Sequence, residues 1–160
     1  MSNANLQIDS KEVISMLVGL DQKLRNKAYR NGLRYSLNIV KKETIKNLRA
    51  RVGKGVTRHK NQNGKTLESG VKIKVYKDLT GGNVHILSDY KLRWFENGTE
   101  PRYNNQKKTT FKLLKKKRYT GRMQALHFFK DAYTSKEREV FSTLEKNIAS
   151  AIQKINNKQK

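Results

Sequence analysis

The sequence predicts a single α+β domain in which a small antiparallel sheet packs against a long central helix and a C-terminal helix. Three patterns lead to this prediction. Apolar residues recur at helical spacing over residues 25–52, a strictly alternating run occupies residues 71–75, and a second helical stripe covers residues 134–155. With 160 residues, the chain has the usual length of one domain around one core.

The first expected elements are helical. Residues 1–24 are expected to form an N-terminal helix or arm, which Asp9 or Ser10 can cap. A longer helix is expected over residues 25–52, ended by Gly53. Its buried stripe is expected to comprise Leu33, Leu37, Val40, Ile45, Leu48 and Val52.

A basic loop is expected over residues 53–66 and a sheet over residues 67–95. The alternation in residues 71–75 predicts a half-buried strand, and the turn residues that follow it predict a hairpin. The apolar run 84–87 returns as the second strand. Residues 92–95 are expected to form a third strand that runs into a tight turn at Asn97 and Gly98.

Residues 102–122 form a second basic loop, with nine Lys or Arg, no acidic residue and three interleaved aromatic residues. One interpretation is a solvated loop, which is usual for runs of like charge. The other is a contact with phosphates, in which the aromatic rings stack on bases. The two are compatible, because a loop without structure of its own can become ordered on its partner. The candidate contact residues are Arg102, Lys107, Lys108, Lys112, Lys115, Lys116, Lys117, Arg118 and Arg122.

The apolar segment 126–132 is expected to dock on the core ahead of the C-terminal helix. Thr134 and Glu137 have the spacing of a capping box, which places the start of that helix at residue 134. Its stripe comprises Val140, Phe141, Leu144, Ile148, Ala151, Ile152 and Ile155.

The composition is strongly basic: 36 Lys and Arg against 13 Asp and Glu leave a formal charge of +23. Such an excess favours a polyanionic partner, of which nucleic acid is the obvious candidate, although a solvated lysine-rich surface is the alternative. The absence of Cys excludes disulfides, thiolate metal sites and cysteine nucleophiles. The apolar run 13–20 is too short to span a membrane and follows acidic residues, so we expect a soluble protein without a signal peptide.

No catalytic, metal or cofactor site is expected. His59, His85 and His127 are far apart and have no partner at ligand spacing, and no phosphate-binding glycine motif or nucleophile elbow occurs. Glu96 and Glu100 flank the expected turn and could serve as general acid and base. An ion pair between Glu96 and a nearby Lys or Arg is favoured, because basic residues greatly outnumber acidic ones.

Four sequence features nevertheless resemble one family. The turn Trp94-Phe95-Glu96-Asn97-Gly98-Thr99 is similar to an aromatic-Glu-x-Gly-Thr turn found in head–tail joining proteins of tailed phages. These are called neck, tail-completion or minor tail proteins, and their founding member is the tenth gene product of a lambdoid phage. The start of their sheet resembles residues 64–69. Their docking Phe-x-x-x-Ala segment resembles Phe129-Lys130-Asp131-Ala132, or begins one residue earlier at Phe128. The resemblance spans roughly residues 25–155, and His127 and Asp131 stand where the family often has proline.

The resemblance implies a structural virion protein without enzymatic activity, assembled in the host cytoplasm and located in the neck. It would form a homo-oligomeric ring between the capsid connector and the tail, in contact with connector and tail proteins. Double-stranded DNA passing through such a ring would meet the basic residues without sequence specificity, or these residues would meet an acidic face of a neighbouring ring. The alternatives are a nucleic-acid-binding protein outside any virion and, third, a small basic ribonuclease.

The same turn is the expected subunit interface. In a strand, Trp94 and Phe95 would point to opposite faces, so that one ring fills the core and the other is left for a neighbour. The alternative is that both rings belong to the core of the monomer. The interface set is Trp94, Phe95, Glu96, Gly98 and Thr99, and the docking segment contributes Phe128, Phe129 and Ala132.

Overall fold

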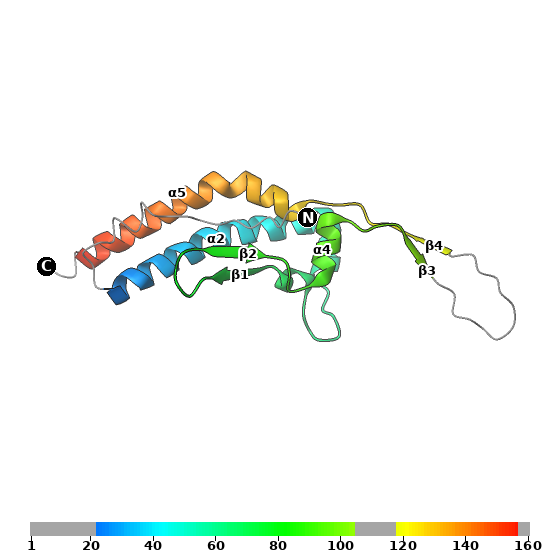
Figure 1. Cartoon of the computed structure of the whole chain (residues 1–160), viewed down its shortest axis with the longest axis horizontal. Helices are drawn as coiled ribbons and strands as arrows, with labels where there is room; N and C mark the ends of the chain where they lie inside the picture. Colours follow the sequence, from blue (N-terminus) through cyan, green and yellow to red (C-terminus); the bar gives the residue numbers. More distant parts are fainter. Residues whose placement is uncertain (1–21, 105–117, 157–160) are drawn as a thin grey trace.

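The computed structural model describes residues 22–104 and 118–156. The described chain is α+β, as predicted: two long helices pack together and carry two antiparallel sheets of two strands each (Figure 1). The predicted N-terminal helix lies outside the described residues, apart from residues 22–24, which open the long helix. In chain order the elements are α2 (Gln22–Val52), α3 (Lys54–Arg58), the 3-10 helix η1 (Leu67–Gly70), β1 (Lys72–Val75), β2 (Gly82–His85), α4 (Tyr90–Asn97), β3 (Arg102–Asn104), β4 (Arg118–Gly121) and α5 (Phe128–Asn156).

The core lies between α2 and α5. Gly32 of α2 permits the close approach of the two helices, because a Cβ there would lie only 3.2 Å from Cγ1 of Ile148 and 3.3 Å from Cδ1 of Leu144. The cost of a glycine within a helix, about 1 kcal/mol relative to Ala, is therefore offset by packing that a larger residue would disturb. The fully buried apolar side chains of the pair include Leu33, Leu37, Val40, Leu48, Val140, Leu144 and Ile148.

The β1–β2 hairpin forms as predicted and covers one side of α2. Ile73 pairs with Val84 and Val75 with Gly82, and this face of the hairpin packs on the core. Gly82 fits there because a Cβ would meet Cδ1 of Leu37 at 2.7 Å. The opposite face carries the exposed side chains of Lys72 and Lys74.

The predicted third strand at residues 92–95 is wrong, because these residues belong to the helix α4. Asp89 caps this helix by accepting a hydrogen bond from the backbone N–H of Lys91 at 3.0 Å. Leu92 and Glu96, four residues apart, form its buried face. Helical spacing thus replaces the alternation that a strand would need, and there is no continuous sheet over residues 67–95.

The predicted start of the C-terminal helix at residue 134 is also wrong, since α5 begins at Phe128. Thr134 and Ser135 lie inside the helix. Their hydroxyls donate to the carbonyls of Lys130 (3.1 Å) and Ala132 (3.2 Å), the usual arrangement of such residues within a helix. The spacing of a capping box is present without its function.

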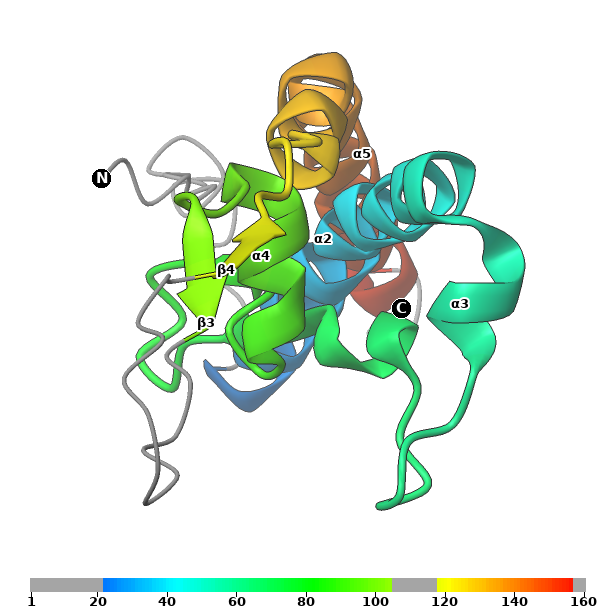
Figure 2. The same cartoon turned by 90° about the vertical axis from the view of Figure 1, so that its right-hand side faces the viewer.

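The two predicted basic loops each contain regular structure. Residues 53–66 include α3, and Glu68 of η1 fastens this region to α2 through Arg49 (2.8 and 2.6 Å) and to α3 through Thr57 (2.8 Å). The hydrogen bonds from the Arg49 guanidinium hold the pKa of Glu68 below its usual value. The ends of the second basic run pair as β3 and β4. Viewed along the long axis, α3 and this β3–β4 ribbon lie on opposite flanks of the molecule (Figure 2).

Candidate functional site

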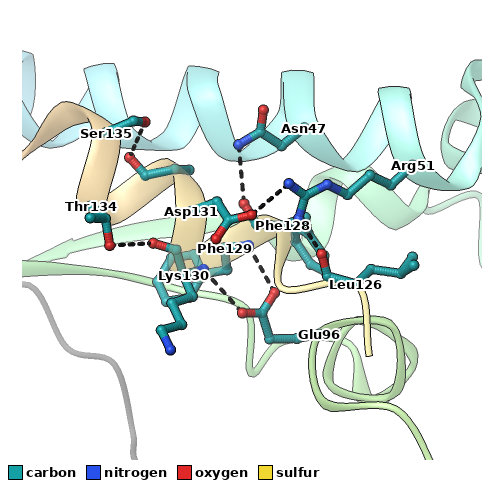
Figure 3. A network of polar contacts seen from close by, with 11 residues as sticks. Asn47, Arg51, Glu96, Leu126, Phe128, Phe129, Lys130, Asp131, Thr134 and Ser135 are labelled. Atoms are coloured by element: carbon teal, nitrogen blue, oxygen red, sulfur yellow. Dashed lines mark hydrogen bonds and ion pairs between the residues drawn. The ribbon is translucent and has the colours of Figure 1, made fainter. Parts of the chain in front are cut away.

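Glu96 joins α4 to the beginning of α5. Its Oε2 accepts a hydrogen bond from the backbone N–H of Phe129 at 2.8 Å, and its Oε1 accepts one from the N–H of Lys130 at 3.0 Å (Figure 3). The side chain is buried, with 7% relative exposure. A carboxylate in this position satisfies two of the unpaired N–H groups of the helix and interacts favourably with its dipole.

The expected ion pair between Glu96 and a Lys or Arg is therefore wrong. Backbone N–H groups from α5, some 33 residues further along the chain, bind the carboxylate instead. Main-chain hydrogen bonds support this contact: the N–H of Leu126 donates to the carbonyl of Phe95 (2.8 Å) and that of His127 to the carbonyl of Glu96 (3.2 Å). His127 precedes the helix with a positive φ of 49°, and its side chain is exposed.

Gly98 and Thr99 continue this connection. Gly98 has a φ of 72°, and a Cβ there would lie 2.7 Å from the carbonyl oxygen of Met123, so the position requires glycine on both counts. Thr99 is bonded twice to Met123: its N–H donates to the carbonyl (3.0 Å) and its hydroxyl accepts from the N–H (2.9 Å). Thr99 thus fastens the segment that precedes α5, Glu96 fastens the start of the helix itself, and Gly98 permits the close approach of the two segments.

The C-terminal half of α2 contacts the same place. Nδ2 of Asn47 donates to the carbonyl of Phe128 at 3.3 Å, and Arg51 pairs with Asp131 at 2.6 Å while also donating to the carbonyl of Leu126 (Figure 3). The side chains of the docking segment, Phe128, Phe129 and Ala132, are buried in the core. We call the set Glu96, Gly98, Thr99, Phe128 and Phe129 the α4–α5 junction.

The β3–β4 ribbon leaves directly from this junction and projects away from the two-helix body (Figure 1). Tyr103 and Tyr119 pair across the ribbon with ring centroids 5.5 Å apart, and both rings are more than half exposed. Arg102 and Arg122 are also exposed. Of the other predicted contact residues, Arg118 lies in β4, whereas Lys107, Lys108, Lys112, Lys115, Lys116 and Lys117 lie outside the described residues.

The two aromatic residues of the predicted subunit interface have different surroundings. Phe95 is half-buried and packs against the core, whereas Trp94 is 41% exposed. The Trp94 ring contacts Tyr90, one helical turn earlier, in an edge-to-face pair with centroids 4.9 Å apart. The different environments result from their places on a helix, not from the alternation expected for a strand.

No group of three or more His, Asp or Glu side chains in the described part of the chain is placed to hold a metal ion, and no described helix is long and apolar enough to cross a membrane. A hollow of about 430 Å³ lies beside the junction, and Glu100 and Arg122 are the charged residues of its lining. His85 lies in β2, where burial, together with Lys72 and Lys74, lowers its pKa.

The contacts that Asn47, Arg51 and Asp131 make between α2 and α5 were not predicted from the sequence. One signal was available: an Asp in the first turn of a helix is favoured by the helix dipole, and Asp131 fits a helix that begins at Phe128.

Comparisons of the chain with protein-family models, with curated proteins and with solved structures find no match.

Proposed function

We propose that this protein is a structural component of the head–tail junction of a tailed phage, where it forms a ring between the capsid connector and the tail and has no enzymatic activity. The observation that carries the proposal is the α4–α5 junction. Two features of the resemblance, the Glu-x-Gly-Thr turn and the Phe-containing docking segment, contact one another through hydrogen bonds of Glu96 and of the residues beside it.

The third feature of the resemblance also has a definite structural task. Thr66 accepts a hydrogen bond from the N–H of Ser69 and so caps η1, and Glu68 attaches η1 to α2 and α3. If the chain shares the architecture of the family it resembles, its motif residues should hold separate elements together, and these residues do so. The short motifs that carry the resemblance thus correspond to contacts between elements of the fold, and this supports the proposal.

The shape of the molecule suits assembly. The core lies between α2, α5 and the β1–β2 hairpin, while the β3–β4 ribbon extends beyond it (Figure 1). Neighbouring subunits or DNA can therefore contact the ribbon without disturbing the core. Arg102, Arg122 and the exposed rings of Tyr103 and Tyr119 supply charge and aromatic surface for that contact.

Two partners for the ribbon remain open under this proposal. Facing the lumen of a ring, its cations would meet the phosphates of passing double-stranded DNA through salt-sensitive contacts without sequence specificity. Facing another ring, they would meet an acidic protein surface. The charge of +23 suits either partner and favours a monomer before assembly, because like-charged copies repel one another.

The second candidate is a nucleic-acid-binding protein that acts outside any virion, favoured by the exposed tyrosine pair beside arginines on a two-stranded ribbon. Aromatic rings beside cations bind single strands by stacking and charge. A basic ribonuclease is third. RNA cleavage that is lost on replacing His85 or Glu100, in protein shown to be folded, would support that third function over the other two.

Electron microscopy of intact phage particles that encode this chain tests the proposal. We expect a closed ring of copies at the neck, with the ribbon toward DNA or toward a neighbouring ring. Absence of the chain from purified particles would refute the assignment to the virion, and nucleic-acid-binding and nuclease assays would then follow. A ring whose ribbons contact protein alone would support the structural role and exclude the contact with DNA.

A further inference from the structure

A groove with free cations runs between α2 and the outer edge of β1. Its volume is about 370 Å³, and its lining combines two half-buried apolar side chains, Ile73 and Val75, with polar and basic residues of α2 and of the hairpin turn. The full lining is Arg30, Arg34, Asn38, Ile73, Val75, Tyr76 and Lys77.

Three cations of this groove have no acidic partner among residues 22–104 and 118–156. Arg30, Arg34 and Lys77 are exposed, and the ion pairs of the described chain involve other residues. No described carboxylate lines the groove. The site therefore attracts negative charge, and its partner has to supply that charge.

The edge of β1 also offers unused backbone hydrogen-bonding groups. β1 pairs only with β2 in the described chain, and the hydrogen bond from Tyr76 N–H to the carbonyl of Gly81 continues the ladder beyond Val75. Because bonded and non-bonded pairs alternate in an antiparallel ladder, the N–H and C=O groups of Ile73 and Val75 point away from β2. No other described backbone group pairs with them.

These same residues, Ile73 and Val75, line the groove, so the groove lies beside residues whose backbone groups are open for pairing. The hairpin runs alongside α2 (Figure 1). Arg30 and Arg34 are one helical turn apart, a rise of about 6 Å along α2. Side chains at alternate positions of an added strand are about 6.6–6.8 Å apart, so two acidic side chains on one face of that strand match the spacing of the two arginines.

We propose that this groove binds an extended acidic peptide segment of a partner protein, which adds to β1 as a further strand and places alternate carboxylates on Arg30 and Arg34. Backbone hydrogen bonds to Ile73 and Val75 give affinity, and the charge pattern gives selectivity. Phosphodiester backbones are the less suitable occupants, because they have no N–H groups to pair with the strand edge. The inference concerns α2 and β1 and does not depend on a place in a virion.

The test uses the full chain and a fluorescent eight-residue peptide in which Glu and Thr alternate, with a Gln and Thr peptide as the uncharged control. We expect saturable binding of the acidic peptide. The double variant Arg30→Gln with Arg34→Gln should weaken it about tenfold, the combined effect of two exposed charge pairs. The matched variant Lys42→Gln with Lys154→Gln removes two exposed charges elsewhere and should change the affinity less than about twofold.

Backbone methylation separates strand addition from charge attraction. Two isomers of the acidic peptide carry N-methyl groups on alternate amides, either all on Glu or all on Thr. Only one set of amides faces β1 in an added strand, so one isomer should lose binding while the other keeps it. Equal affinity of the two isomers would overturn the proposal.

Three further results would each overturn it. One is displacement of the peptide by a single-stranded thymidine oligonucleotide of equal charge at the same concentration, which would make the groove a general anion site. Another is a shift of the free chain from oligomer to monomer in the Arg30 and Arg34 double variant, which would make a second copy the occupant. The last is failure of the folded full chain, checked by circular dichroism, to bind the acidic peptide.

Discussion

Replacing Glu96 by Ala tests whether the α4–α5 junction holds the fold together. The substitution leaves the N–H groups of Phe129 and Lys130 without their carboxylate acceptor at the start of α5. Loss of a helix cap costs about 0.5–2 kcal/mol, and each hydrogen bond to a charged group contributes about 1.5–3 kcal/mol. Water can partly replace the carboxylate as the acceptor for the N–H of Lys130, which is the more exposed of the two residues, so the total loss is smaller than the sum of these contributions. We expect a loss of about 2–4 kcal/mol in the free energy of unfolding.

The assay is urea unfolding followed by circular dichroism. With a slope of about 2 kcal/mol per molar urea, the midpoint should fall by about 1–2 M. Glu96→Gln keeps one acceptor oxygen but loses the charge, so its midpoint should lie between those of the original protein and of Glu96→Ala. The control is Glu100→Ala, which removes an exposed carboxylate four residues away and should change stability by less than about 0.5 kcal/mol.

Amide hydrogen exchange gives an independent measurement. In Glu96→Ala the N–H groups of Phe129 and Lys130 should exchange faster than in the original protein, while amides in the middle of α5 should change only by the global loss of stability. Equal midpoints for Glu96→Ala and Glu100→Ala, together with unchanged exchange at Phe129, would refute the cap and the importance of the junction.

Three further predictions concern other contacts. Gly98→Ala should destabilise the protein by about 1–3 kcal/mol, because a side chain there meets both a positive φ and the carbonyl of Met123, and its thermal midpoint measures this. Glu68→Gln should lower the free energy of unfolding by about 1–2 kcal/mol, because it removes the negative charge beside Arg49. Since the pKa of Glu68 is lowered in the folded state, the stability that its charge contributes is present above pH 4.5 and is lost as the pH falls below that value. Urea midpoints measured at pH 7 and at pH 4 will show this loss. The lowered pKa of His85 likewise predicts stability that is present above pH 6.5 and lost as the pH falls, and His85→Gln should reduce the difference between midpoints at pH 7.5 and 5.5.

Local patterns predicted the elements whose buried face repeats regularly. The buried stripe of α2 runs from Ala28 to Leu48, about six turns, and the alternation around Ile73 leaves one face for the core, so periodicity alone identified both the long helix and the hairpin. The eight residues of α4 were too few for such a signal. Asp89 at its cap was the local indication of a helix, whereas Trp94 and Phe95 were mistaken for residues of a strand.

The start of α5 shows a different kind of error. Thr134 and Glu137 imitate a capping box, and the actual cap, Glu96, comes from another helix. A capping group distant in sequence leaves no pattern near Phe128, so local rules cannot find it. The pairing of β3 with β4 is similarly invisible, because its partners are separated by the long basic run.

Composition and short-range periodicity were enough to predict the α+β class, the two long amphipathic helices, the β1–β2 hairpin and the basic character of the chain. Tertiary contacts were needed to establish where α5 begins, that residues 90–97 are helical, and that Glu96 caps α5 when the two helices meet. They also place Arg30 and Arg34 in one groove with residues of β1. These contacts join residues far apart in the chain, and their free energy is gained only when packing brings the partners together.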